Sequence, residues 1–411
     1  MTIDKNQQAS GAFQSKLFFA LWIATIFANV AMWMQNVGAE WVMVSLTPSP
    51  FMVALVQSAI TLPVFLLGLP AGVMSDLLDR QQLLLWTHAS MFLASGALAL
   101  VSHLGMLGPW ALLFLTFIVG CCAALAITAR LVSISDVVPR SALVQALALN
   151  SIAYNSARAV GPALAGILLA WLGPTAVFLA AACMFGVVVV IQLRFFTPPA
   201  QGAAPGESAI NAMLSGMRYV RQTPLLHTYF MRVILFVAFA SSLWALLPVI
   251  AHGLMKFNAS GYALLLGCMG AGAVILGVVL EPLRRNFSLD TLATASGLVF
   301  AAAIFISALS SSTFIVCAGL VAAGGAWVVI NSITTAAVQT TLPSSVRARV
   351  VSIYLLVFNG AMAFGGAFWG AVASQLGLKS TLAMAATLAV CGALYARRYP
   401  ILLGKDADAT L

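Results

Sequence analysis

Four residues in the first apolar stretch of the chain have side chains and a spacing that suit polar chemistry. They follow one another at intervals of four, three and four residues: Asn29, Trp33, Asn36 and Glu40. This spacing places all four on one face of an α-helix. Because polar groups on an otherwise apolar helix turn toward a partner or toward water, the face is predicted to line a cavity. Glu40 is the candidate proton carrier, and the alternative is that Glu40 lies in ordinary water at the cavity mouth.

Two charged segments match each other at a distance of 205 residues. The first contains Gly72, Asp76 and Arg80, and the second contains Glu281 and Arg285. In each segment an acid and a base lie one helical turn apart, so we predict a gate at the cytoplasmic boundary. The carboxylate of Asp76 would bind the positive N-terminal end of a facing helix. The alternative is a charged loop that is simply solvated.

A third group of residues lies in the fifth apolar run. Asn155 and Arg158 precede a set of residues that lets helices pack closely or bend: Gly161, Pro162 and Gly166. An arginine inside such a run is costly unless it faces a partner or water, so Arg158 is predicted to line the cavity or support the bend. A purely structural pairing of Arg158 is the alternative. Asn359 matches Asn155 in the second half of the chain and is a further candidate for the cavity wall or for a helix–helix hydrogen bond.

The composition shows what kind of chain must position these groups. Of 411 residues, 62% are apolar and 7% are charged, and the mean hydropathy is +1.04. Soluble proteins carry about 25% charged residues, so a soluble enzyme, a nucleic-acid-binding domain and a disordered scaffold are excluded. The six cysteines lie in apolar runs, and the four histidines have no metal-ligand spacing. We therefore predict no catalytic residues, no metal, no cofactor and no nucleic-acid partner.

Twelve apolar runs are long enough to cross a bilayer, which needs about 20 residues in a helix. They span residues 17–45, 51–74, 83–103, 109–131, 143–171, 175–194, 225–251, 260–280, 291–310, 313–337, 349–374 and 379–396. The fold class is therefore an all-α polytopic membrane protein with two pseudo-symmetric six-helix bundles. The predicted organisation is an N-terminal tail (1–16), a first bundle (17–196), a linker (197–223), a second bundle (224–398) and a C-terminal tail (399–411).

The basic residues predict the orientation, because lysine and arginine near span ends stay on the cytoplasmic side. With both termini inside, 15 of the 19 lysines and arginines lie at or near the cytoplasmic face, and only Lys256 and Lys379 lie outside. Arg158 and Arg232 lie within spans, and Arg232 is expected to extend toward the lipid headgroups. This distribution indicates a multi-pass protein of the cytoplasmic (inner) membrane.

The two halves of the chain repeat each other. A shift of 204 residues superimposes Pro139, Asn155, Gly161, Gly166 and Gly173 on Pro343, Asn359, Gly365, Gly370 and Gly377. Parallel repeats of six spans are typical of secondary transporters that move two bundles about a central site. A channel or a membrane enzyme has less use for this symmetry.

Several segments resemble a known family. They are Trp33 to Trp41, Leu62-Pro63, Pro70 to Arg80, Asp136 to Pro139 and Asn150 to Gly166. They are similar to the major facilitator superfamily, and within it to the enterobactin-exporter-like branch, also called the transmembrane secretion effector type. The last segment resembles the antiporter signature of proton-coupled drug exporters, without its upstream glycines. Leu77 and Gln81 depart from the basic residues that are usual in the gating loop, as does Asp79 from the usual glycine.

Together these observations predict a secondary transporter that exports a small molecule (a drug-like compound, a siderophore or a metabolite) by alternating access. The resemblance implies proton antiport, and the chain carries no ATP-binding signature. The expected partners are the small-molecule substrate, the proton gradient and the lipid bilayer, with the protein acting as a monomer. Proton-coupled uptake is the alternative. A membrane enzyme or scaffold is a third reading, which lacks clustered catalytic groups.

Overall fold

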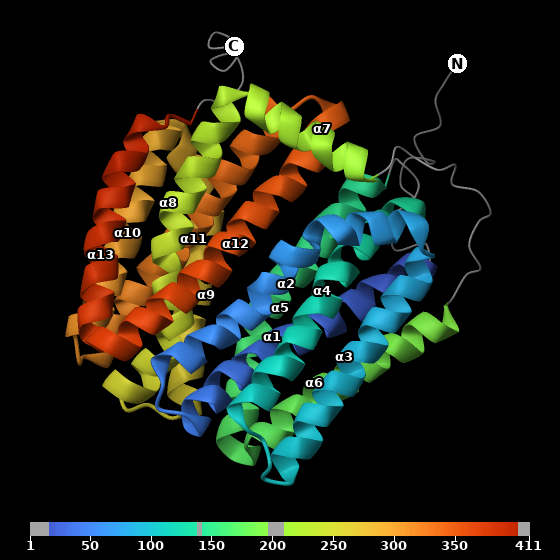
Figure 1. Cartoon of the computed structure of the whole chain (residues 1–411), viewed down its shortest axis with the longest axis horizontal. Coiled ribbons are helices and arrows are strands. Elements are labelled where there is room, and N and C mark those ends of the chain that lie inside the picture. Colours follow the sequence, from blue (N-terminus) through green and yellow to red (C-terminus); the bar gives the residue numbers. More distant parts are fainter. Residues whose placement is uncertain (1–15, 138–141, 196–208, 402–411) are drawn as a thin grey trace. The chain divides into compact units, whose positions relative to one another are not determined.

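The structure is a computed structural model that describes residues 16–137, 142–195 and 209–401 (Figure 1). Its first helices are α1 (Lys16–Leu46), α2 (Pro50–Leu77), α3 (Arg80–His103), α4 (Pro109–Val137), α5 (Leu143–Leu172), α6 (Pro174–Arg194) and α7 (Ala209–Gln222). They are followed by α8 (Pro224–Val249), the π-helical turn η3 (Ile250–Leu254), α9 (Ala259–Asn286), α10 (Leu289–Leu309), α11 (Thr313–Thr341), α12 (Ser344–Leu376), α13 (Leu378–Tyr395) and the 3₁₀ turn η4 (Ala396–Arg398). The described residues contain no strand, so the predicted all-α class is confirmed.

Eleven of the described helices are long and apolar enough to cross a membrane, and α5, with 30 residues, is the twelfth long helix. The predicted apolar runs and the observed helices agree closely. Helix α7 is much shorter, with 14 residues, and lies within the predicted linker. It packs against the beginning of α12, where Arg349 Nη1 donates to Ser215 Oγ at 2.9 Å.

The helix ends follow from local sequence. Asp79 and Asn258 cap α3 and α9, because their side-chain oxygens accept backbone N–H groups of the first turn at 2.8 and 3.1 Å. Gly173 and Gly377, which lie 204 residues apart, separate α5 from α6 and α12 from α13. Their φ angles are 79° and 80°, values that favour glycine. The turn between two helices thus occurs at the same place in both repeats.

The repeat also predicts matched helix contacts. A Cβ atom on Gly161 of α5 would lie 2.5 Å from Trp33 Cβ and 3.3 Å from Val30 O of α1. On Gly365 of α12 it would meet Ser241 Oγ and lie 3.2 Å from Ala238 O of α8. Both helix pairs therefore approach each other at a glycine, as the small-residue spacing indicates.

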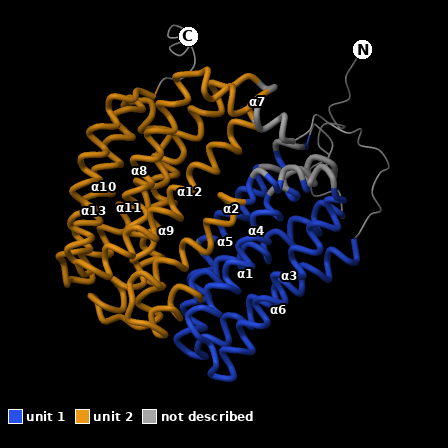
Figure 2. The backbone as a smooth tube through the Cα atoms, viewed as in Figure 1, with its two compact units in different colours: residues 1–38, 67–206 blue, residues 39–66, 207–411 orange. Residues whose placement is uncertain are grey.

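The chain forms two compact units (Figure 2). The described part of unit 1 lies within residues 1–38 and 67–206, and its core packs α3 against α4 and α6 around Met91, Phe178 and Phe185. Unit 2 contains residues 39–66 and 207–411, and its core includes an aromatic cluster around Trp327. The division of the chain at the linker into two bundles stays a prediction; residues 39–66, from α1 and α2, pack within unit 2.

Candidate functional site

The side chain of Glu40 lies at the end of α1 within unit 2. Its Oε2 accepts a hydrogen bond from Tyr262 Oη of α9, and the tyrosine is fully buried. The Trp41 ring stacks on Tyr262 with centroids 5.7 Å apart and meets the edge of His252 in η3 at 5.8 Å. Glu40 is therefore half-buried with a defined partner, in a cluster of groups from three helical segments. Its role as a proton carrier and the alternative of a residue at the cavity mouth both stay predictions.

Helix α2 also packs against the later part of the chain within unit 2. Ser58 Oγ donates to the Ala363 carbonyl oxygen at 2.7 Å, and the Phe51 N–H donates to Ser374 Oγ at 3.0 Å. Gly370 of α12 lies against Ala54, Phe51 and Pro50 of α2. The turn between α1 and α2 and the segments beside it are thus tied to α9 and α12 by both polar and close backbone contacts.

The remaining three residues of the predicted face, Asn29, Trp33 and Asn36, belong to unit 1. Asn29 is buried, and its Oδ1 accepts from Arg130 Nη1 of α4 at 3.5 Å. Trp33 packs edge-on against Tyr154 of α5 with ring centroids 6.4 Å apart. Asn36 is half-buried. Asn29 and Glu40 therefore contact different partners, one inside unit 1 and one inside unit 2.

The two matched asparagines adopt the same local arrangement. Asn155 Nδ2 donates to Ser151 O, and Asn359 Nδ2 donates to Leu355 O, each at 2.8 Å and each to the preceding turn of its own helix. Neither makes a helix–helix hydrogen bond among the described residues, so that alternative is not supported. Arg158 is half-buried without an ion-pair partner in the described part of the chain.

The glycines and the proline of the fifth run lie where the sequence predicts them. Gly161, Pro162 and Gly166 are buried within α5, and Pro162 is inside the helix. Gly161 makes the close contact with α1 described above. The structure therefore gives this segment a packing role, and its role in a bend stays a prediction.

The predicted gate is described only in part. The side chains of Gly72 and Asp76, near the end of α2, lie outside the described residues. Arg80 begins α3 and is half-buried. Arg285 Nε and Glu281 Oε1 of α9 lie 3.7 Å apart as an i,i+4 pair, and both side chains are largely exposed. Such exposed pairs contribute at most about 1 kcal/mol, so this pair is easily broken.

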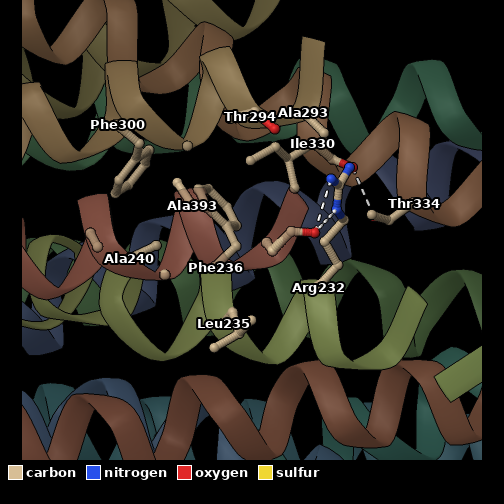
Figure 3. A pocket seen from close by; sticks show the side chains of 14 residues that line it. Arg232, Leu235, Phe236, Ala240, Ala293, Thr294, Phe300, Ile330, Thr334 and Ala393 are labelled. Carbon is tan, nitrogen blue, oxygen red and sulfur yellow. Dashed lines mark hydrogen bonds between the residues drawn. The ribbon is translucent and has the colours of Figure 1, made fainter. Parts of the chain in front are cut away.

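The expectation that Arg232 extends toward the headgroups is wrong. Its side chain is 5% exposed and lies 2.8 Å from Asp290 Oδ1 of α10. Nε and Nη2 donate to the Ala396 carbonyl oxygen at 3.2 and 3.1 Å (Figure 3). The guanidinium lies at one side of a cavity inside unit 2, which is otherwise lined mostly by apolar residues such as Phe236 and Phe300. A partly exposed counter-charge, 58 residues away in the sequence, and the Ala396 carbonyl oxygen hold Arg232 inward.

Sequence reasoning missed several groups of this architecture. Tyr262 is a single tyrosine in an apolar helix, 222 residues from Glu40, and no spacing connects the two. Arg130 counts among the basic residues of the predicted cytoplasmic face, but its side chain contacts Asn29 inside unit 1. In the sequence Arg130 lies one residue before the end of the predicted run 109–131, where an arginine can also extend to the headgroups, so the sequence did not indicate this inward contact.

Comparison with known proteins agrees with this architecture. The family model described as "Transmembrane secretion effector" matches residues 8–410. The chain is 26% identical to the uncharacterized MFS-type transporter YfiS of Bacillus subtilis (strain 168), over 84% of this chain and 82% of that protein. It is 20% identical to the staphyloferrin A transporter of Staphylococcus aureus (strain NCTC 8325 / PS 47), over 92% of this chain and 94% of that protein.

Solved structures share the fold. A bacterial homologue of the human lysosomal transporter Spinster, inward-facing and unoccupied, superimposes with a TM-score of 0.74 at 15% identity, over 94% of this chain and 97% of that one. The nucleoside transporter NupG gives 0.75 at 12% identity, over 93% and 99%. These likenesses confirm the predicted major facilitator fold, while the enterobactin-exporter branch stays a prediction. Because the family model covers nearly the whole chain, the protein belongs to the transmembrane secretion effector family of major facilitator transporters, and it is a multi-pass membrane transporter rather than an enzyme.

Proposed function

We propose that this transporter exports a small molecule from the cytoplasm by alternating access, in exchange for protons. It would lie in the cytoplasmic membrane as a monomer, with both termini inside. In that topology the turn between α1 and α2 faces outward. The observation that carries the proposal is the set of contacts made there, from Glu40 to Tyr262 and from Ser58 to Ala363. They join helices of the first repeat to helices of the second at the outer end, where an outward-open state requires them to separate.

We propose that Glu40 couples proton binding to the conformational change that opens the outer end. As a carboxylate it accepts the Tyr262 hydroxyl; as a carboxylic acid it gains a donor and loses its charge. A proton arriving from outside would therefore change the contact that closes the outer end. On the inner side, the proposed gate is formed by Gly72, Asp76, Arg80 and the matching pair of Glu281 and Arg285.

The proposed substrate path follows Asn29, Trp33 and Asn36 of α1, with Asn155 and Arg158 on α5 and Asn359 on α12. Polar groups and an aromatic ring suit an amphiphilic cargo with hydrogen-bonding groups. One relative is named for a siderophore, staphyloferrin A, so siderophores are the first cargo class to test, followed by drug-like compounds and other metabolites. Uptake by proton symport uses the same fold and is the alternative direction.

Cross-linking the outer end tests the proposal. Cysteines at Ser58 and Ala363, whose Oγ and carbonyl oxygen are 2.7 Å apart, should form an oxidative cross-link that stops transport until it is reduced. Everted vesicles would be assayed with the fluorescent dye ethidium and with iron-free siderophores, with and without a pH gradient. The matched control is a cysteine pair within one helix, at Ser58 and Thr61. Full transport by the cross-linked protein would refute alternating access, and accumulation only in right-side-out vesicles would favour uptake.

A further inference from the structure

A cavity inside unit 1 corresponds to the Arg232 cavity of unit 2. It is lined by residues of α1, α3, α4, α5 and α6. Counted from the first residue of each helix, the repeat has a shift of 208 residues between α1 and α8, 209 between α3 and α10, and 204 between α4 and α11 and between α6 and α13. The two cavities are lined at positions matched in this way: Ala28 and Phe236, Leu84 and Ala293, His88 and Gly297, Arg130 and Thr334, Val188 and Gly392, and Gln192 and Ala396. Each bundle therefore contains the same interior space, and each space contains one arginine.

The two arginines differ in how their charge is compensated. Arg232 has a carboxylate, Asp290, at 2.8 Å. Arg130 forms neither of the ion pairs found in the described part of the chain, which are Arg232 with Asp290 and Arg285 with Glu281. Its hydrogen bond there goes to the neutral Asn29 at 3.5 Å. Because an uncompensated guanidinium within a membrane-spanning bundle is costly, the unit 1 cavity requires a negative charge from another source.

Two amide side chains near Arg130 can supply further donors: Gln192, which lines the cavity, and Asn29, which contacts Arg130. His88 Nδ1 lies 2.7 Å from the Leu84 carbonyl oxygen, which only accepts, so Nδ1 must carry the proton. The Gln192 amide atom 3.1 Å from Nδ1 is then its oxygen, since amide orientation follows the hydrogen-bond network. This assignment turns the Gln192 NH₂ group to the position that has no hydrogen-bond partner among the described residues. Asn29 Nδ2 and Arg130 Nε also have none.

We propose that the cavity of unit 1 binds a small inorganic anion of chloride size as the counter-ion of Arg130. The donors that such an ion requires are the Arg130 guanidinium, whose Nε–H is unpartnered among the described residues, the Gln192 NH₂ group at the cavity, and the Asn29 NH₂ group beside Arg130. The ion is a structural resident rather than cargo, because the cavity is lined by helices of one unit only. It replaces in unit 1 the carboxylate that Asp290 supplies in unit 2. This inference is independent of the direction and substrate of transport.

The first test measures stability of the purified full-length protein in detergent against the anion alone. Thermal unfolding would be followed by tryptophan fluorescence in sodium chloride, sodium bromide and sodium gluconate at equal ionic strength. Chloride and bromide should raise the midpoint saturably by about 3–8 °C at 100 times the dissociation constant, while gluconate, which is larger, should not. Equal midpoints in all three salts would overturn the proposal and leave water as the partner of the free donors.

Two variants locate the effect. Asn29→Asp places a carboxylate beside Arg130 without changing the size of the side chain, so the stability in gluconate should rise and the chloride effect should disappear. Asp290→Asn is the matched change in unit 2: it removes the counter-charge of Arg232 and should create a second, larger chloride effect. If Asn29→Asp does not fold, Arg130→Gln takes its place in the test, and it should abolish the chloride effect. Chloride dependence that persists in either variant overturns the proposed site.

Discussion

Gly161→Ala and Gly365→Ala should both destabilise the protein, because both glycines lie in close helix contacts, but only the loss caused by Gly365→Ala should be rescued by shortening a neighbouring side chain. At Gly365 the added methyl group meets Ser241 Oγ, and its next neighbours are Ala238 O and Ser241 Cβ, each at 3.2 Å. At Gly161 it meets Trp33 Cβ at 2.5 Å, an atom that no side-chain rotation can move. Overpacking of this kind costs about 1–3 kcal/mol, which corresponds to a fall of about 2–10 °C in the unfolding midpoint.

The difference appears when the neighbouring side chain is shortened. Ser241→Ala removes the atom that Gly365→Ala meets, so the double variant should regain most of the lost stability. The Ala238 carbonyl oxygen, which Ser241 contacts at 2.8 Å, keeps Trp369 Nε1 as a donor at 2.7 Å, and the serine change alone should therefore cost little. Trp33→Ala keeps the Cβ atom, and it should not rescue Gly161→Ala.

Thermal unfolding in detergent and dye transport in vesicles measure both effects. Gly267→Ala on α9 is the control, because no atom lies within 4 Å of the added methyl group there; it should be neutral or slightly stabilising. Gly365→Ala that behaves like Gly267→Ala would refute the close α8–α12 contact. Equal rescue of Gly161→Ala by Trp33→Ala would refute the reasoning about which atom is fixed.

Three further predictions concern the charged residues. Glu40→Gln should uncouple transport from the pH gradient, and Tyr262→Phe should weaken coupling without removing it; retained coupling in Glu40→Gln vesicles would remove Glu40 as the proton carrier. Asp76→Asn should reduce transport while expression stays normal, and unchanged dye efflux would reject its role in the gate. Arg158→Ala should reduce transport per folded molecule, whereas Arg232→Ala should reduce the folded yield, as measured by size-exclusion chromatography; the opposite division would reject both assignments.

The sequence predicts those features of the fold that depend on local pattern. Helix limits follow from apolar length and from turn residues, so the predicted run 143–171 and the observed Leu143–Leu172 agree. The repeat carries packing information as well, because Gly161 and Gly365 must each be small where two helices cross. Contacts between distant segments lack such a signal. Arg232 lies 58 residues from Asp290 and 164 from Ala396, and these two distant partners hold it inward.

Comparing the two repeats recovers some of this missing information. Each bundle has its own interior cavity, and corresponding positions of the two bundles line the two cavities. A difference in charge between two corresponding positions therefore shows where a counter-charge is needed, without any alignment to other chains. Thr334 occupies the position of Arg130, and Arg232 occupies the position of Ala24; each cavity therefore retains one cation but holds it on a different helix. In unit 2 that cation is matched by Asp290. The same physical requirement applies in unit 1, where the partner of Arg130 among the described residues is a neutral asparagine, and the proposed anion would satisfy it.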